Sequence, residues 1–297
     1  MRVDSDRLFF LFAVMALSLL VTAFLATGCG GDDDDDDDDV GSGTLEFYTN
    51  GEEFIRDGFT GKTGWDIEFT HFYVNLDEIV AFQAAEEEND STPCHAGHDH
   101  GDIPEGSEHV LLDGSPFWVD LHEGTDRSLL GTMQNVVAGN YNYINFNMVR
   151  TAQGDYSGYS IVMTGTASKE TEEKATETVD FTIKLTEQMK FIGCHQETDD
   201  QYAGVVEDGG TGSTEMTFHS DHLFGDIESI EDPESVNPGA LGFQPFADLA
   251  SEGVLDIDQT GMQAQMSADD YTTFIAALHT LGHSGEGHCG YEDYEEE

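Results

Sequence analysis

Basic residues are scarce in this chain: 10 Lys and Arg stand against 61 Asp and Glu, which gives a formal net charge of −51. A protein that binds nucleic acid must neutralise phosphates, so this balance excludes nucleic acid as a partner. Anionic lipid headgroups would be repelled for the same reason. Cations would be attracted, although weakly and without selectivity. The charge is typical of adaptation to a salty habitat, where screening removes the self-repulsion; a cation-collecting role is the alternative.

Cysteine is also rare, and most sequence motifs of catalysis are missing. Three cysteines follow Cys29, namely Cys94, Cys194 and Cys289, so at most one intramolecular disulfide forms among them. No Cys-x-x-Cys-His motif indicates covalent haem. No Gly-x-Ser-x-Gly elbow, His-Glu-x-x-His helix or Gly-rich phosphate loop is present. The sequence therefore predicts no nucleotide and assigns no catalytic residue.

The first 28 residues have the pattern of a secretory signal. Two arginines precede the apolar run from Leu8 to Leu25, and Ala-Thr-Gly-Cys29 follows. This ending resembles a bacterial lipobox, in which Cys29 is the lipidated residue. We therefore expect a signal peptide over 1–28 and a lipid-anchored protein of the outer membrane, facing the periplasm or the cell surface. An uncleaved anchor helix is the alternative.

Residues 29–43 are mostly Gly, Asp and Ser and include the acidic run Asp32–Asp39. This composition forms no core and predicts a self-repelling, disordered tether behind the lipidated cysteine.

Alternating aromatic and β-branched residues begin after the tether. The clearest runs are Trp65–Val80 and Tyr141–Val149. In the first run the pattern places His71 on the apolar face and indicates a bulge near Tyr73–Val74. Turns recur at near-regular spacing, and no βαβ alternation is visible. We predict an antiparallel β-sandwich of about seven to nine strands over 44–230.

Residues 231–297 differ from the sandwich. A short helix is predicted over Pro245–Ser251. A second begins after Ser267 as its N-cap and ends at Gly282. Its apolar face should pack on the sandwich, which makes this segment a helical C-terminal extension.

The first candidate metal site is the segment Cys94–Asp102, between two strand-like runs. It holds three histidines, His95, His98 and His100. Imidazole, thiolate and carboxylate are common ligands of zinc, copper and nickel. A loop that must first be ordered binds with modest affinity, so we expect it to act as a collector. A merely solvated loop is the alternative.

Two further clusters lie near the C-terminus. The first is His219, His222 and Asp226, whose histidines can converge only if the strand ends near Ser220 and turns helical. The second comprises His283, His288 and Cys289, where glycines let the tail fold around an ion.

A disulfide between Cys194 and Cys289 would bring these two clusters together. We prefer this pair over a three-cysteine metal site because thiolates oxidise outside the cytoplasm. Residues Asp256–Gly261 match half of a calcium loop, but Ser267 replaces the bidentate Glu, so calcium is not expected.

Two segments resemble the methanobactin-partner (MbnP-like) β-sandwich family. They are Phe72–Leu76 (Phe-Tyr-Val-Asn-Leu) and Val137–Phe146, which contains Ala-Gly-Asn-Tyr. The resemblance implies a secreted sandwich associated with periplasmic copper. The runs Phe218–Asp226 and Leu281–Cys289 look like those of uncharacterised bacterial outer-membrane lipoproteins. This second resemblance supports the architecture.

The leading hypothesis is a lipid-anchored sandwich that binds a transition metal, zinc ahead of copper, for storage or delivery. The expected site residues are His219, His222, Asp226, His283 and His288. The expected partners are the membrane, the metal ion, and a membrane transporter or surface protein. A structural or adhesive surface lipoprotein with incidental histidines is the main alternative. A metal-dependent hydrolase is the third; it would need three protein ligands, an open position and a nearby base.

Overall fold

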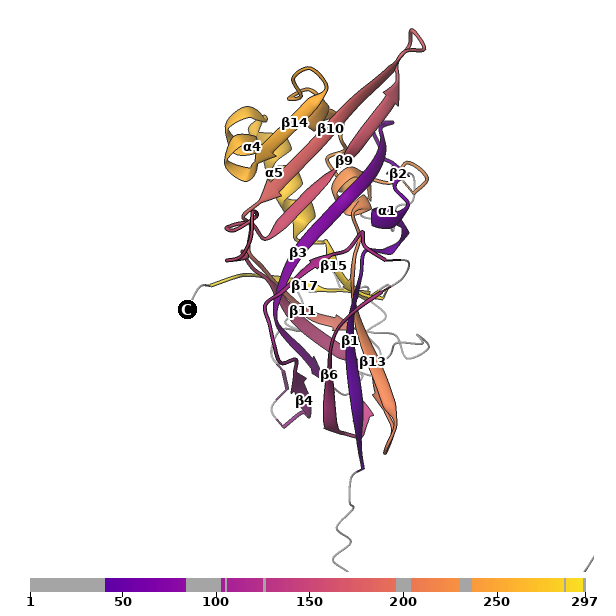
Figure 1. Ribbon diagram of the computed structural model, residues 1–297, viewed down its shortest axis with the longest axis vertical. Coiled ribbons are helices and arrows are strands. Elements are labelled where there is room, and N and C mark those ends of the chain that lie inside the picture. Colours follow the sequence, from indigo (N-terminus) through magenta and orange to yellow (C-terminus); the bar gives the residue numbers. More distant parts are fainter. Residues whose placement is uncertain are drawn as a thin grey trace, which may run out of the picture. The chain divides into compact units, whose positions relative to one another are not determined.

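The described residues form two large β-sheets (Figure 1) and a short two-stranded ribbon. The computed structural model describes residues 41–83, 103–104, 106–124, 127–195, 204–229, 237–285 and 287–295. The five-stranded sheet runs, in spatial order, through β16 (Gly287–His288), β15 (Gly282–Ser284), β13 (Thr211–Phe218), β1 (Ser42–Asn50) and β6 (Ser128–Val137). The ribbon pairs β12 (Val205–Val206) with β7 (Gly139–Asn140).

The larger sheet has ten strands and is organised around β3 (Asp66–Phe82). Its main path runs through β14 (Val254–Asp258), β10 (Thr176–Leu185), β9 (Ile161–Glu170), β3, β8 (Tyr143–Met148), β11 (Met189–His195) and β17 (Gly290–Asp293). Three more strands pair with β3 outside this path: β2 (Phe59–Thr60), β4 (His109–Leu111) and β5 (Phe117–Asp120). The mainly β, sandwich-like fold expected from the sequence is confirmed.

The described residues contain 17 strands, more than the sequence predicted. The difference comes from strands of two to four residues, which are too short to show a periodicity. Two pairs, β1 with β13 and β10 with β14, are parallel, and alternation alone does not reveal strand direction. In the described part of the chain, no helix is long and apolar enough to cross a membrane.

The bulge in β3 lies at a different place from the predicted one. The register against β9 shifts between Phe69 and His71, and the register against β8 shifts between Asp77 and Val80. The extra residue at the first shift reverses the alternation. Phe72 therefore faces the core, and the side chain of His71 is 45% exposed. The expectation that His71 lies on the apolar face is wrong.

The C-terminal segment contributes helices and also strands to both sheets. The helices of the fold are α1 (Glu52–Arg56), α2 (Asp221–Phe224), the 3-10 helix η1 (Asn237–Gly239), α3 (Gln244–Ala247), α4 (Gln259–Gln265) and α5 (Ala268–Leu278).

Ser267 caps α5 by accepting a hydrogen bond from the Asp270 backbone N–H, as its sequence predicted. The helix ends at Leu278, however, and Gly282 begins β15. The half calcium loop is divided between β14 and α4, where Asp258 caps α4.

Two aromatic groups fill the core on either side of α2. One includes Phe146, Phe191 and Phe218, whose rings come from both sheets. The other lies under the helices, where Phe224 contacts the rings of the α3 and α5 region. The residues between Phe218 and Phe224 are thus fixed at both ends by packed rings, and two of the candidate histidines lie in this interval.

Gly282 lets β15 approach the larger sheet closely. A Cβ atom added at Gly282 would lie 2.7 Å from Cδ1 of Phe191 and 3.0 Å from Cζ of Phe146. Both rings are fully buried and cannot move freely. The missing side chain is therefore what lets β15 lie against these rings.

We predict that Gly282→Ala lowers the free energy of unfolding by about 1–3 kcal/mol, the usual cost of overpacking a core. The matched control is Gly239→Ala, because a Cβ at Gly239 would meet no atom within 4 Å. Urea unfolding of both variants measures the effect. Equal stabilities for the two variants would show that β15 does not depend on this close approach.

Candidate metal centre

Three buried histidines come together from two distant segments of the chain. His219 and His222 flank the start of α2, and His283 lies in β15. Each residue offers one ligand atom, and these atoms lie within 4.8 Å of one another. The three residues are between 2% and 7% exposed. They are a group of imidazoles that could hold a metal ion.

The turn after β13 brings the first two imidazoles onto one side. The strand ends at Phe218 and α2 begins at Asp221, so the change from strand to helix falls where convergence requires it. The His222 backbone N–H donates to the carbonyl of His219, which closes the turn. The ring centroids of the two residues are 5.4 Å apart.

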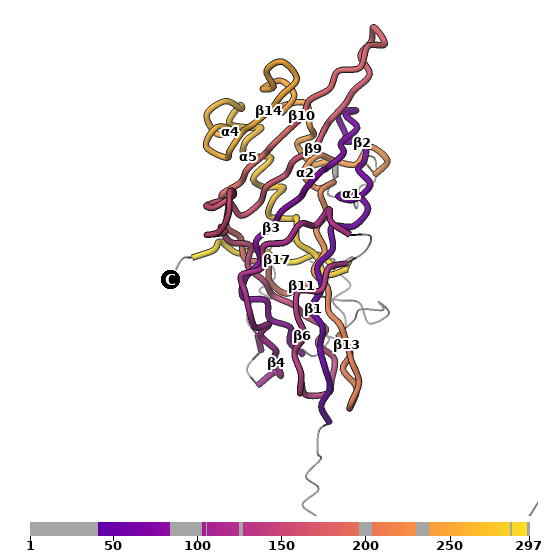
Figure 2. The backbone as a smooth tube through the Cα atoms, in the orientation of Figure 1, coloured from indigo at the N-terminus to yellow at the C-terminus, as the bar shows by residue number. Residues whose placement is uncertain are grey.

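Strand pairing brings the third imidazole to the same place. A row of directly paired residues crosses four neighbouring strands: Asn50, Thr217, His283 and His288. Paired residues share one face of a sheet, so both histidines of this row lie on the same face. Their ring centroids are 4.3 Å apart, and that of His283 lies 4.0 Å from that of His219. Figure 2 shows the path of the chain, in yellow, from α5 through this region toward β17.

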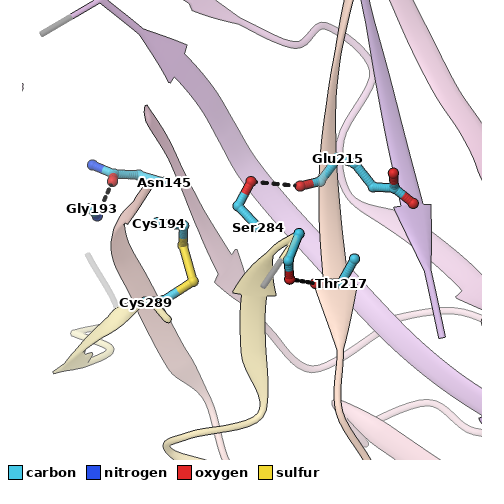
Figure 3. The surroundings of a disulfide bond; sticks show 8 residues. Asn145, Gly193, Cys194, Glu215, Thr217, Ser284 and Cys289 are labelled. Carbon is cyan, nitrogen blue, oxygen red and sulfur yellow. Dashed lines mark hydrogen bonds between the residues drawn. A yellow bond between two sulfur atoms is a disulfide. The ribbon is translucent and has the colours of Figure 1, made fainter. Parts of the chain in front are cut away.

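Side-chain hydrogen bonds tie β15 to β13 beside the cluster (Figure 3). Ser284 Oγ donates to the carbonyl of Glu215, and Thr217 Oγ1 donates to the carbonyl of Gly285, each over 2.8 Å. Gly285 has a φ of 55°, a left-handed conformation that suits glycine in the turn from β15 to β16. These contacts hold the hairpin that carries His283 and His288.

A disulfide joins Cys194 on β11 to Cys289, the residue after His288. This is the pair predicted from the sequence. Figure 3 shows it beside β15. It links the end of the five-stranded sheet to the larger sheet, and it keeps both sulfurs out of metal coordination.

The hydrogen bonds of the imidazoles show which ring nitrogens are available. Nδ1 of His222 lies 2.6 Å from the carbonyl of Thr280. A carbonyl only accepts, so Nδ1 carries the proton and Nε2 keeps its lone pair. Both ring nitrogens of His283 are buried, and neither makes a hydrogen bond of good geometry within the described part of the chain, although the Thr280 backbone opposes the lowering of its pKa. A buried polar atom in this state is costly, and a bound metal ion would remove that cost.

Burial favours the neutral form of two of the imidazoles, His222 and His283. Desolvation and the neighbouring His219 lower the pKa of His222 to about 3, although the Thr280 carbonyl opposes the change. The pKa of His283 is lowered well below 6.5, first by desolvation and then by the three neighbouring histidines. Neutral imidazole is the form that binds metals, so His222 and His283 need no deprotonation at neutral pH.

The ligand atoms of the cluster are somewhat farther apart than the ligand atoms of a closed zinc site. Four ligands about 2.1 Å from zinc in a tetrahedron lie about 3.4 Å from one another. The three ligand atoms lie within 4.8 Å of one another. Side-chain movements of about 1 Å would therefore bring them to the distances found in a zinc site.

Asp226 does not belong to this group. Its carboxylate accepts hydrogen bonds from the backbone of Glu228 and from the backbone and hydroxyl of Ser229. It therefore closes the turn after α2. His288 lies beside His283 but outside the group of three. Cys29, His95, His98 and His100 lie outside the described residues.

Two contributors to this site carry no sequence signal. The Thr280 carbonyl orients His222 across 58 residues of sequence. Oε2 of Glu52 lies 3.3 Å from Nε2 of His219, 167 residues away. Backbone carbonyls and single glutamates occur throughout any chain, so only the tertiary structure reveals these contacts.

Comparison with known proteins does not identify the chain: no family model, no curated protein and no solved structure matches it. The function is therefore inferred from the geometry of the site.

We predict that the metal-free protein loses stability as the pH falls from 6.5 toward 3. The His222 pKa is depressed in the folded state, so below pH 6.5 the unfolded chain binds more protons. Each pH unit in this range costs up to about 1.4 kcal/mol per imidazole. Urea unfolding at pH 6.5 and 5.0, with chelator present, measures the loss.

The matched variant is His222→Gln, which keeps an N–H donor for Thr280 but cannot take up a proton. Its loss between the two pH values should be smaller than that of wild type by about 1–2 kcal/mol. The exposed His109→Gln variant should behave as wild type does. Identical losses in all three proteins would contradict the assignment of the acid sensitivity to His222.

Proposed function

We propose that this protein is a lipid-anchored, extracytoplasmic metal-binding protein that stores or delivers a transition metal, zinc ahead of copper. The observation that carries the proposal is the imidazole of His283, which is 2% exposed and, among the described residues, makes no hydrogen bond of good geometry at either nitrogen, although the Thr280 backbone acts on its pKa. It lies between other imidazoles with their rings 4.0–4.8 Å away. A core histidine with a purely structural role would normally have its nitrogens hydrogen-bonded.

The donor set supports the choice of metal. The candidate ligands are imidazoles, which suit zinc, copper and nickel. Cys194 and Cys289 form a disulfide, so these two residues offer no thiolate of the kind that selects copper(I). The ring of His288 faces that of His283 across the β15–β16 pair and is the nearest further imidazole. His288 would complete a tetrahedral site of four imidazoles, which is suited to holding a metal more than to catalysis.

The cellular setting of the proposal comes from the sequence. The lipobox-like ending at Cys29 supports an anchor, and the oxidised Cys194–Cys289 pair fits an oxidising compartment. The excess of acidic residues would raise the local concentration of cations. The segment with His95, His98 and His100 would collect the metal for the buried centre.

We predict that the purified protein binds zinc and is stabilised by it. At free zinc a hundred times the dissociation constant, the free energy of unfolding should rise by about 2.7 kcal/mol. His283→Ala should lose most of this gain, and the exposed His109→Ala should keep it. Thermal unfolding with zinc and with chelator, together with metal analysis, tests this.

Two outcomes would overturn the proposal. One is no bound metal above background and no shift of the melting temperature with zinc. The other is the same shift in the wild type and the His283→Ala variant. If chelator leaves the stability of the wild type, His283→Ala and His109→Ala unchanged, the result would instead favour a structural or adhesive module with incidental histidines.

A further inference from the structure

A carboxylate lies beside the imidazole cluster although its sequence position gives no hint of it. Oε2 of Glu52 is 3.3 Å from Nε2 of His219. The Glu52 side chain is 21% exposed and that of His219 is 9% exposed. The pair is therefore largely shielded from water, so an interaction of this carboxylate with a nearby N–H group or cation is screened less than it would be at the surface.

The backbone places Glu52 there by an unusual conformation. β1 ends at Asn50, and α1 begins at Glu52 with a φ of 53°, a left-handed value that is unfavourable for glutamate. The side chain of Asn50 stabilises this turn by accepting hydrogen bonds from the Glu52 backbone N–H and from Arg56. Asn50 is also the first member of the row that crosses to His283. The same strand register therefore positions the carboxylate and the imidazoles.

The position of the carboxylate has consequences for a bound metal. A divalent ion held by neutral imidazoles leaves two positive charges in a buried site, and a nearby anion offsets their desolvation. A metal-bound imidazole generally donates its second N–H to a carboxylate or a carbonyl, which fixes the ring and raises its basicity. Thr280 has this role for His222. Glu52 is in position to have it for His219.

We propose that Glu52 is the positioning residue of the metal centre: its carboxylate accepts the Nε2–H of His219 and leaves Nδ1 of His219 as the metal-binding atom. This inference rests on the proposed metal-binding function. It adds a residue and a coordination mode that the three-histidine cluster alone does not specify. A small rotation of the His219 ring would turn the 3.3 Å contact into this hydrogen bond.

The chain offers a matched control for this carboxylate. A pocket of about 340 Å³ borders the site and is lined by Asn50, Glu52, Glu53, Phe54, Arg56 and His219. Glu53 therefore shares the pocket with Glu52 and has the same charge, but its side chain is exposed. If the carboxylates act only by attracting cations, the two residues should be equivalent.

The experiment compares Glu52→Gln with Glu53→Gln in the full-length protein. Zinc affinity is measured by competition with a chelating dye, and the visible d–d absorption of bound Co²⁺ reports the coordination. Glu52→Gln should weaken zinc binding about 10–100-fold and change the Co²⁺ spectrum. Glu53→Gln should match wild type in both. Both variants should keep the wild-type melting temperature in chelator.

A third variant separates the effect of the Glu52 carboxylate charge from a structural role of the Glu52 side chain. Glu52→Asp keeps the carboxylate on a shorter side chain, so its zinc affinity should lie between those of wild type and Glu52→Gln. An equal loss in Glu52→Asp and Glu52→Gln, with a lower melting temperature in chelator, would mark a merely structural role and overturn the proposal. An equal loss in Glu52→Gln and Glu53→Gln would also overturn it, because general attraction would explain both.

The proposed function and this inference fail in different ways. If the wild-type protein takes up no zinc, both are overturned. If the wild-type protein binds zinc and Glu52→Gln binds it equally well with the same Co²⁺ spectrum, only the role of Glu52 is overturned.

Discussion

The pairing of β15 with β13 is the contact on which the candidate site depends. It is short, with Thr217 opposite His283 and Phe218 opposite Gly282. Without it, His283 would lie far from the histidines of the α2 turn, because more than 60 residues separate them in the sequence. The close approach of Gly282 to the buried rings, the hydroxyl hydrogen bonds and the disulfide all fix the same hairpin. Several independent interactions therefore hold one set of imidazoles in place.

The position of the cluster explains both its burial and its chemistry. It lies between two aromatic groups, one shared by the two sheets and one under the helices. His283 is buried there, which lowers its pKa and makes a ring nitrogen without a hydrogen bond of good geometry costly. Thr280 and Glu52 contact the other two rings from opposite ends of the chain. A buried group of imidazoles with such neighbours could hold a metal ion.

The histidines differ in how they could be recognised. His219 and His222 are three residues apart, and their convergence could be foreseen once a strand-to-helix change was assumed. The tail histidines could be connected to them only through the suspected Cys194–Cys289 disulfide, which the structure contains. Asp226 had suitable chemistry and spacing, but it closes a local turn. Local hydrogen bonding competes with metal coordination for a carboxylate, and sequence spacing does not decide between them.

The amino-acid sequence by itself determined the mainly β class, the start of α5 at Ser267 and the set of chemically able residues. These depend on local periodicity, capping and side-chain type. The tertiary structure alone decided the register of β3, the exposure of His71, and the union of His219, His222 and His283 with Glu52 at its edge. A one-residue bulge or a two-residue strand pair leaves little trace in local composition. Yet each one decides which side chains share a face and which of them meet.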